Sequence, residues 1–150
     1  MKAAQKIMPP NYFIALLILS ITLHFVLPIR KIIYPPTTYI GFLVIAFGAI
    51  MNLWTDRLFN QKNTTVKPYL NPSELITTGP FQYSRHPMYL GMASVLLGVA
   101  INHGTVSTFI APTVFIVLME TLFIPIEEKN LTDVFGEEYL AYKQKIKRWI

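Results

Sequence analysis

Long apolar runs, broken by short polar segments, form the main pattern of this chain. They predict four membrane-spanning helices at about residues 11–29, 39–54, 88–102 and 106–126. A helix suits such a run because its backbone groups bond to one another where the bilayer core offers no water. Short turns join the first run to the second and the third to the fourth, which predicts two helical hairpins.

The segment after the fourth run has an amphipathic pattern instead. Its large apolar residues recur every three or four positions, namely Leu131, Phe135, Tyr139, Tyr142, Ile146 and Trp149. This spacing gathers them on one face of a helix, and four basic residues between positions 143 and 148 supply a basic side. We therefore predict a terminal helix over residues 131–149 that lies on the membrane surface, with its basic side chains toward lipid headgroups.

A polar stretch over residues 57–83 separates the two predicted hairpins. Loops of this length often act as lids or binding loops, and we place this one on the membrane surface. Its small apolar piece, Leu75-Ile76, is expected to dock onto the helices. The whole pattern predicts a single domain over residues 1–150: an all-α membrane protein with about four transmembrane helices and a C-terminal amphipathic helix in the cytoplasm.

The composition excludes an ordinary soluble protein. Hydrophobic residues make up 53% of the chain and charged residues 14%, whereas soluble domains carry about 25% charged residues. The net charge of +5 does not indicate a nucleic-acid partner, because the basic residues flank apolar runs. Membrane lipids are the expected contacts, and no obligate protein partner is indicated. The chain has no cysteine, and its three histidines lie on different segments, so no metal site is expected.

The distribution of positive charge predicts the orientation in the membrane. If the N-terminus is cytoplasmic, eleven of the 13 lysines and arginines lie on the cytoplasmic side, and only Arg30 and Lys31 lie outside. Cytoplasmic segments of membrane proteins are enriched in these two residue types. We therefore expect a multi-pass integral membrane protein with both termini in the cytoplasm.

Small residues on the predicted spans indicate close packing between helices. Gly91, Ser94 and Gly98 share one face of the third span, and Gly41 and Gly48 share one face of the second. We expect the third span to pack through its small residues against the fourth span, because a short turn joins the two.

Residues 79–91 concentrate polar chemistry at the edge of the third span. Pro87 suits the first turn of a helix, where its missing N–H would have had no partner, so His86 stands at the helix cap. A helix N-terminus carries a partial positive charge, and Arg85 adds a full one. The segment should therefore attract a carboxylate or a phosphate. The alternative is a basic turn that only contacts lipid headgroups.

Two ionisable residues lie within the predicted spans. Glu120 costs about 2.5 kcal/mol or more at such depth unless it is paired, protonated or facing a cavity. It precedes Glu127 and Glu128 by two helical turns, so all three carboxyl groups point to broadly the same side. Either a structural partner, such as Asn52 or His24, or a substrate would explain Glu120. His24 is either a neutral histidine bonded to a neighbouring helix or a catalytic group.

Two blocks of the sequence resemble a known family. The first is Arg-His-Pro-Met-Tyr-Leu-Gly at residues 85–91, preceded by Gly79-Pro80-Phe81 and Tyr83. The second is Glu127-Glu128, followed by Leu131, Phe135-Gly136, Tyr139, Tyr142 and Arg148-Trp149. Both are similar to signatures of the integral-membrane methyltransferases related to isoprenylcysteine carboxyl methyltransferase and phospholipid N-methyltransferases. The likeness runs from about residue 75 to the end of the chain.

This resemblance implies methyl transfer from S-adenosyl-L-methionine to a lipophilic or small acceptor with a carboxyl, amine or thiol group. It implies that Arg85 and His86 receive the cofactor's carboxylate, and that Glu127 and Glu128 accept hydrogen bonds from its ammonium or ribose hydroxyls. The other implied cofactor-binding residues are Gly79, Tyr83, Tyr89, Gly91, Tyr139 and Tyr142. Arg85 and Glu120 are the candidate catalytic residues, and for an amine acceptor either Glu120 or His86 is the general base. A lipid-facing opening between helices is also implied.

Two other classes of function stay open. Sterol reductases, which use a nicotinamide cofactor such as NADPH, share an Arg-His-Pro-x-Tyr motif, typically with Asn at x and an acidic residue after the glycine. Here Met88 and Met92 stand at those two positions. The other alternative is a non-catalytic membrane scaffold, which would bind the cofactor without transferring a methyl group.

Overall fold

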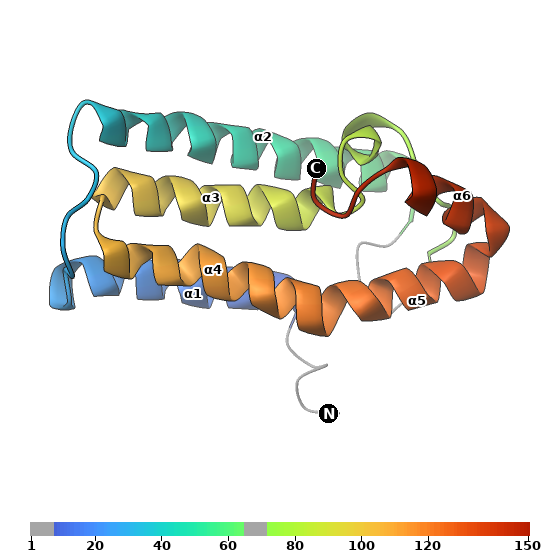
Figure 1. Cartoon of the computed structure of the whole chain (residues 1–150). Helices are drawn as coiled ribbons and strands as arrows, with labels where there is room; N and C mark the ends of the chain where they lie inside the picture. Colours follow the sequence, from blue (N-terminus) through green and yellow to red (C-terminus); the bar gives the residue numbers. More distant parts are fainter. Residues whose placement is uncertain (1–7, 65–71) are drawn as a thin grey trace.

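The structure, a computed structural model, describes residues 8–64 and 72–150. Within these residues it is built from helices, with one isolated β-bridge between Lys31 and Thr105. The helices are α1 (Pro9–Val26), α2 (Ile40–Gln61), α3 (Pro87–His103), α4 (Ile110–Leu118), α5 (Ile124–Phe135) and α6 (Glu137–Lys145) (Figure 1). A π-helical turn (Met119–Phe123) joins α4 to α5, and short 3-10 turns precede α2, α3 and α4 (Thr37–Tyr39, Gly79–Gln82 and Val106–Phe109).

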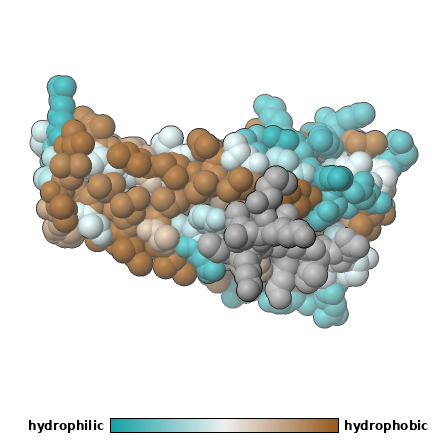
Figure 2. Space-filling model, turned by 90° about the horizontal axis from the view of Figure 1, so that it is seen from below, coloured by the Kyte–Doolittle hydropathy of each residue, from teal (hydrophilic) through white to brown (hydrophobic). Residues whose placement is uncertain are grey.

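Three of the described helical segments are long and apolar enough to cross a membrane: Pro9–Val26, Thr37–Gln61 and Val106–Phe135. The remaining predicted span, α3, is also apolar but has only 17 residues. Many of its side chains are buried among the other helices, so these helices shield much of α3 from the bilayer. On the face shown in Figure 2, hydrophobic residues cover most of the part away from α6, and hydrophilic residues gather toward the α6 end. The prediction of an all-α membrane protein is confirmed.

α2 and α3 run antiparallel and contact each other through glycines (Figure 1). A Cβ atom on Gly48 would collide with the carbonyl oxygen of Gly91, and one on Gly98 would collide with that of Gly41. The prediction that these glycines permit close packing is confirmed, but the predicted partner of α3 is wrong. The glycines of α3 pack on α2 instead of the fourth span, because Gly41 and Gly48 give α2 a complementary small face.

Replacing Gly48 with alanine is expected to lower the free energy of unfolding by about 1 to 3 kcal/mol, which is typical of overpacking. The new methyl group would meet backbone atoms of α3, and these cannot rotate away as a side chain can. Thermal unfolding in detergent measures the effect. Ala49→Leu is the control, since it adds more volume on an exposed face of α2. Equal melting temperatures for Gly48→Ala and the wild type would contradict this packing.

The fourth span continues without interruption as a bent helix to Phe135, beyond its predicted end at residue 126. The bend has a local cause in Pro125, which lacks an N–H and crowds the carbonyl group four residues earlier. The π-helical turn accommodates the proline, since the N–H of Ile124 bonds to the carbonyl oxygen of Met119, five residues back. Glu120 lies within this turn.

The terminal helix predicted over residues 131–149 is divided in the structure. Gly136 has φ +51° and ψ −125°, which a residue with a Cβ atom rarely adopts, and the chain turns back there. α6 ends at Lys145, and Ile146 is extended. The predicted apolar stripe still assembles in part: Leu131, Phe135, Tyr139, Tyr142 and Ile146 form one cluster with Leu58, Phe59, Leu75, Ile76 and Phe81. The predicted docking of Leu75-Ile76 is thereby confirmed.

α2 also extends beyond its predicted end, from residue 54 to Gln61. Thr55 is buried, whereas Arg57, Asn60 and Gln61 are exposed on the end of this helix instead of lying in the loop predicted over residues 57–83. Part of that loop, residues 65–71, lies outside the described residues. The extra turns bring Phe59 into edge contact with Phe81, with their ring centroids 5.6 Å apart.

Candidate active site

The N-terminus of α3 is the place where distant parts of the chain meet. His86 occupies the cap position before α3, as predicted from Pro87. The C-terminal residues pass alongside it: the N–H of Arg85 donates to the carbonyl oxygen of Lys147 (3.0 Å), and the Ser84 hydroxyl donates to that of Arg148 (3.0 Å). These bonds hold the end of the chain against the start of α3 (Figure 1).

Glu128, on α5, is the centre of an ion-pair network. Its carboxylate lies 3.0 Å from Arg85 Nη2 and 3.3 Å from Lys143 Nζ. Arg148 binds both oxygens, with Nε 3.0 Å from Oε1 and Nη2 2.9 Å from Oε2. The Arg85 and Glu128 side chains are only 8% and 6% exposed, so each needs the other to compensate a buried charge. The network joins α5 and α6 to the cap of α3.

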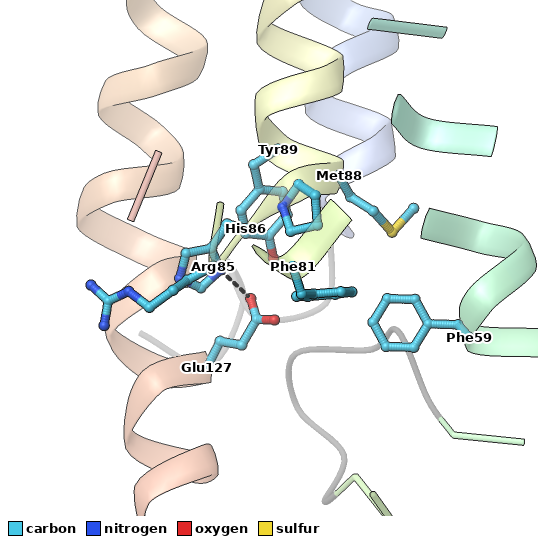
Figure 3. Close-up of a pocket in the computed structure, with 8 residues that line it drawn as sticks. Phe59, Phe81, Arg85, His86, Met88, Tyr89 and Glu127 are labelled. Carbon is cyan, nitrogen blue, oxygen red and sulfur yellow. Dashed lines mark ion pairs between the residues drawn. The ribbon is translucent and has the colours of Figure 1, made fainter. Parts of the chain in front are cut away.

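His86 lies between two carboxylates. Its Nδ1 is 3.4 Å from Glu127 Oε2 (Figure 3). Its Nε2 is 3.5 Å from Glu128 Oε1. These contacts are not aligned as hydrogen bonds, so His86 Nε2 and Glu127 Oε2 have no hydrogen-bond partner. The ring stacks on Tyr89 with a centroid separation of 5.7 Å. Burial lowers the pKa of His86, but the two carboxylates outweigh burial and raise this pKa above its ordinary value of 6.5.

The raised pKa of His86 predicts pH-dependent stability. Because the folded-state pKa exceeds the unfolded value, the stabilisation is complete below about pH 6.5 and is lost as the pH rises through the folded-state pKa. We expect the melting temperature of the wild type to fall across this range relative to that of His86→Gln, which does not titrate there. Thermal scans in detergent from about pH 5 to about pH 9 test this. Parallel curves for the two proteins would contradict it.

Glu120 has a structural partner, but not one of those predicted. One of its oxygens pairs with Arg148 Nη1, and the other accepts a hydrogen bond from Trp149 Nε1 at 3.0 Å. Asn52 contacts Gly91 in the packing of α2 on α3. The turn at Gly136 explains the difference, because it returns Arg148 and Trp149 to the helix that carries Glu120.

A pocket of about 280 Å³, including its open side, lies beside this network (Figure 3). Its lining consists of Phe59, Phe81, Arg85, His86, Pro87, Met88, Tyr89 and Glu127. Several buried polar atoms in or beside it have no hydrogen-bond partner: Arg85 Nε and Nη1, His86 Nε2, Glu127 Oε2 and Tyr139 Oη. Folded proteins rarely leave buried polar atoms unpaired. The pocket therefore has both donors and acceptors to offer a ligand.

Tyr139 and Tyr142 of α6 pack beside the pocket. The hydroxyl of Tyr142 donates to the carbonyl oxygen of Phe81 at 2.7 Å, which ties α6 to the segment before α3. Burial and the negative charge of Glu128 raise the pKa of Tyr139 to about 12. Its phenol is therefore neutral at physiological pH and has a proton to donate.

Of the nine predicted cofactor-binding residues, three line this pocket, namely His86, Tyr89 and Glu127. Glu128, Tyr139 and Tyr142 are not in its lining, and neither are Gly79, Tyr83 and Gly91. The Tyr83 side chain is 65% exposed. Gly91 lies in the packing of α2 on α3, where a Cβ atom would meet the side chain of Asn52. Gly79 has φ +61° and packs next to Trp54 and Leu58 at the end of α2. Its positive φ fits the turn that leads to Arg85, so glycine serves the backbone there.

The structure also adds residues that we did not assign to the site from the sequence. Phe59 and Phe81 supply two aromatic walls of the pocket, and Met88 lines it as well. Arg148 connects Glu120 with Glu128. Phe59 was missed because the predicted second span ended at residue 54. The Gly136 that follows Phe135 is the signal for the turn that returns Arg148.

The other two histidines lie together, away from His86. The rings of His24 and His103 stack with centroids 4.3 Å apart, and the Nδ1 atoms of both rings have no hydrogen-bond partner. The hydrogen bond to a neighbouring helix that we considered for His24 is therefore absent at Nδ1. In residues 8–64 and 72–150, no three histidine, cysteine or acidic side chains are grouped as metal ligands.

Comparison with known proteins identifies a family match. Residues 36–138 match the sequence profile of a family described as phospholipid methyltransferase. The matched region covers about two thirds of the chain and includes α2, α3, α4 and α5. It therefore extends the likeness seen from residue 75 onward to the second membrane span.

Three curated proteins are similar over parts of this chain. A Haemophilus influenzae protein described as uncharacterized is 35% identical over 63 residues, which are 42% of this chain and all of that protein. Protein-S-isoprenylcysteine O-methyltransferase of Saccharomyces cerevisiae is 33% identical over 75 residues, 48% of this chain and 30% of that enzyme. Methanethiol S-methyltransferase 1 of Bradyrhizobium diazoefficiens is 30% identical over 84 residues, 56% of this chain and 28% of that enzyme. The chain thus spans less than a third of these two enzymes.

A solved structure is similar in fold. The eukaryotic intramembrane Ras methyltransferase ICMT, an isoprenylcysteine carboxyl methyltransferase, matches with a TM-score of 0.60 and 24% sequence identity. The matched region covers 76% of this chain and 42% of that enzyme. At this level of identity the likeness shows a shared fold and nothing finer.

Proposed function

Since this chain belongs to the phospholipid methyltransferase family, we propose that it transfers a methyl group from S-adenosyl-L-methionine to an acceptor reached from the membrane. The observation that carries this proposal is the set of unpaired polar atoms around the α3 cap. These atoms come from two segments that are 42 residues apart in the chain, Arg85-His86 and Glu127. Oppositely charged side chains that each keep a polar atom without a hydrogen-bond partner in one pocket suit a ligand that carries both an anion and a cation.

The pocket residues match S-adenosyl-L-methionine in charge and in aromatic character. Arg85 Nε and Nη1 are buried donors without partners, suited to the cofactor's carboxylate. Glu127 Oε2 is a free acceptor for its ammonium group or a ribose hydroxyl. The rings of Phe59, Phe81 and Tyr89 line the pocket. An aromatic face next to a sulfonium contributes about 0.5 to 2 kcal/mol of cation–π attraction.

The bound cofactor would supply an electrophilic methyl group on a sulfonium. The residues of this chain then have three tasks: to bind the cofactor, to align the acceptor with its methyl group, and to exclude water from the pocket. The ion pairs of Glu128 hold Arg85 in a fixed position at the pocket wall, which supports alignment. A carboxylate acceptor needs no general base, whereas an ammonium or thiol acceptor must also lose a proton.

Neither of the two candidate bases, Glu120 and His86, is well placed to take a proton from the acceptor. Both oxygens of Glu120 are engaged by Arg148 and Trp149, and the raised pKa of His86 favours its protonated form. We therefore propose that Glu120 positions the C-terminal segment and that His86 binds the cofactor's carboxylate.

Formation of S-adenosylhomocysteine tests the proposed function. Purified protein in lipid vesicles is given S-adenosyl-L-methionine with an isoprenylcysteine analogue, phosphatidylethanolamine or a small thiol. We expect product with at least one acceptor class and a loss of about 100-fold in His86→Ala and Glu127→Ala, which remove charge-assisted contacts. Tyr83→Phe, an exposed position, is the control and should stay active. If the protein binds the cofactor but forms no product with any of the three acceptors, a non-catalytic scaffold would be favoured instead.

We also propose that the site end of the molecule faces the cytoplasm. Lys31, in the loop between α1 and α2, and Lys145, the last residue of α6, are exposed. This loop and α6 lie at opposite ends of the molecule (Figure 1). The chain has no cysteine of its own. In intact cells, a membrane-impermeant maleimide is expected to label Lys31→Cys and to leave Lys145→Cys unlabelled until the cells are opened. The reverse labelling pattern would overturn this orientation.

A further inference from the structure

The end of the molecule opposite α6 holds a cluster of polar groups without partners. His24, in the last turn of α1, stacks on His103, the last residue of α3, with an angle of 11° between the rings. The Nδ1 atoms of both rings are buried and have no hydrogen-bond partner. The same is true of the hydroxyl oxygens of Thr105 and Ser107, two residues that are 3% and 1% exposed. Since folded proteins rarely leave such atoms unpaired, the cluster has hydrogen bonds to offer a ligand.

Two cations, Arg30 and Lys31, lie beside this cluster in the loop between α1 and α2. Lys31 pairs with Thr105 in the β-bridge, and residues paired in this way carry their side chains on the same side, about 5 Å apart at Cβ. The N–H of Val106 donates to the carbonyl oxygen of Arg30 at 3.2 Å. Both cationic side chains are exposed, and the Lys31 ammonium lies 5.4 Å from the centroid of the exposed Tyr34 ring. They are therefore within reach of a ligand at the cluster.

The segments that build this end contain no acidic residue. All eight aspartates and glutamates of the chain lie between positions 56 and 74 or between positions 120 and 138, and residues 20–50 and 94–116 have none. The charged or titratable groups in these two segments are His24, Arg30, Lys31, Tyr34, Tyr39 and His103. The positive charge of this end therefore has no carboxylate from these segments to neutralise it, which favours an anionic ligand.

Exposed apolar side chains surround the cluster and indicate the source of the anion. Phe25 and Val26 of α1 and Ile110 of α4 are largely exposed, on helices that are apolar enough to cross a membrane. Tyr34 and Tyr39 are exposed as well, as is typical of the belt of aromatic residues at the membrane interface. A phosphate that belongs to a lipid would place its hydrocarbon chains against these apolar side chains, whereas a free phosphate would make no contact with them.

We propose that this end of the molecule binds an anionic phospholipid, whose phosphate lies among Arg30, Lys31 and the stacked histidines. The phosphate oxygens would accept hydrogen bonds from the two cations and from the Thr105 hydroxyl. A headgroup that carries an ammonium, as in phosphatidylcholine, would find no carboxylate here, so headgroups without a positive charge, as in phosphatidylglycerol, are preferred. This lipid is not the methyl acceptor, because the candidate active site lies at the other end of the molecule (Figure 1). The inference is therefore independent of the proposed function.

The two histidines make the binding of this lipid depend on pH. Histidine ordinarily changes its charge between about pH 5 and pH 8. Two protonated rings in the stack of His24 on His103 would repel each other, and the adjacent cations would add to the repulsion. A bound phosphate supplies the negative charge that offsets it. Binding of the lipid therefore favours protonation of the histidines, and by linkage the affinity for the lipid rises as the pH falls.

Photolabelling of the whole protein in phosphatidylcholine vesicles tests this inference. The probe is phosphatidylglycerol with a diazirine in its headgroup, and mass spectrometry locates the label. We expect label on the loop after α1 and on the turn after α3. Arg30→Gln combined with Lys31→Gln should lower this label about 30-fold, the loss expected for two basic side chains at a charged membrane surface. Lys129→Gln combined with Lys145→Gln removes the same charge from exposed positions of α5 and α6 and should leave this label unchanged.

Competitors and pH test the headgroup and the histidines. Unlabelled phosphatidylglycerol should displace the label, and inorganic phosphate should not. Labelling of the wild type should rise several-fold from about pH 8 to about pH 6, and the rise should be lost in His24→Gln combined with His103→Gln. Displacement by inorganic phosphate as effective as by the lipid would overturn the lipid as the source of the phosphate. Equal labelling by a phosphatidylcholine probe, or unchanged labelling in the Arg30 and Lys31 variant, would overturn the anionic site.

Discussion

Replacing Glu128 with alanine is expected to lower the free energy of unfolding by about 3 to 5 kcal/mol, the cost of removing one partner of a buried ion pair. Arg85, 8% exposed, would be left without its only carboxylate partner among the described residues. Arg148 and Lys143 would also lose a partner, and the C-terminal segment would be held less firmly. Equilibrium unfolding in mixed detergent measures the loss.

Two further variants make this test specific to the network. Glu138→Gln, at an exposed position on α6, should change the free energy of unfolding by no more than about 0.5 kcal/mol, as surface substitutions usually do. Glu128→Gln keeps the size of the side chain, so a loss that it shares with Glu128→Ala reports on charge. A loss below about 1 kcal/mol in both Glu128 variants would show that the ion pairs do not support the fold.

Replacing Arg85 with lysine is expected to weaken the binding of S-adenosyl-L-methionine by about 10- to 150-fold. Lysine keeps the positive charge opposite Glu128, but it lacks the planar pair of N–H groups that Arg85 leaves unpaired at Nε and Nη1. Hydrogen bonds to charged groups contribute about 1.5 to 3 kcal/mol each, which gives this range. Isothermal titration calorimetry on detergent-purified protein measures the affinity.

The control for Arg85→Lys is the same exchange at an exposed arginine. Arg57→Lys, at the exposed end of α2, should leave the affinity for the cofactor unchanged. The melting temperature of Arg85→Lys should stay close to that of the wild type, since the lysine still neutralises Glu128. An unchanged affinity in a folded Arg85→Lys protein would mean that Arg85 does not hold the cofactor's carboxylate.

Local rules in the sequence were enough for several features of the fold. Pro87 places His86 at the cap of α3 because a helix tolerates proline only in its first turn. The glycines of the second and third spans predicted close packing, and it occurs. The packing partner of α3 was predicted wrongly. The short turn after α3 suggested the fourth span, whereas the matching glycines of α2 determine the partner.

Which residues meet at the site depends on contacts between parts of the chain that are far apart in the sequence. The spacing of Glu120, Glu127 and Glu128 placed three carboxylates on one side of a helix, and the structure joins two of them through Arg148. Periodicity alone predicted one straight terminal helix, which would have carried Arg148 away from them. The positive φ of Gly136 lets the chain reverse there instead. Only tertiary packing then decides which side chains meet, as the exposure of Tyr83 illustrates.

The binding of S-adenosyl-L-methionine is the measurement that tests the candidate active site most directly. Calorimetry compares the wild type with His86→Ala and Glu127→Ala, and NADPH serves as the control ligand. We expect saturable binding of S-adenosyl-L-methionine by the wild type, its loss in both variants, and no binding of NADPH. A folded wild type that fails to bind S-adenosyl-L-methionine, or that binds NADPH saturably in its place, would contradict the methyltransferase site.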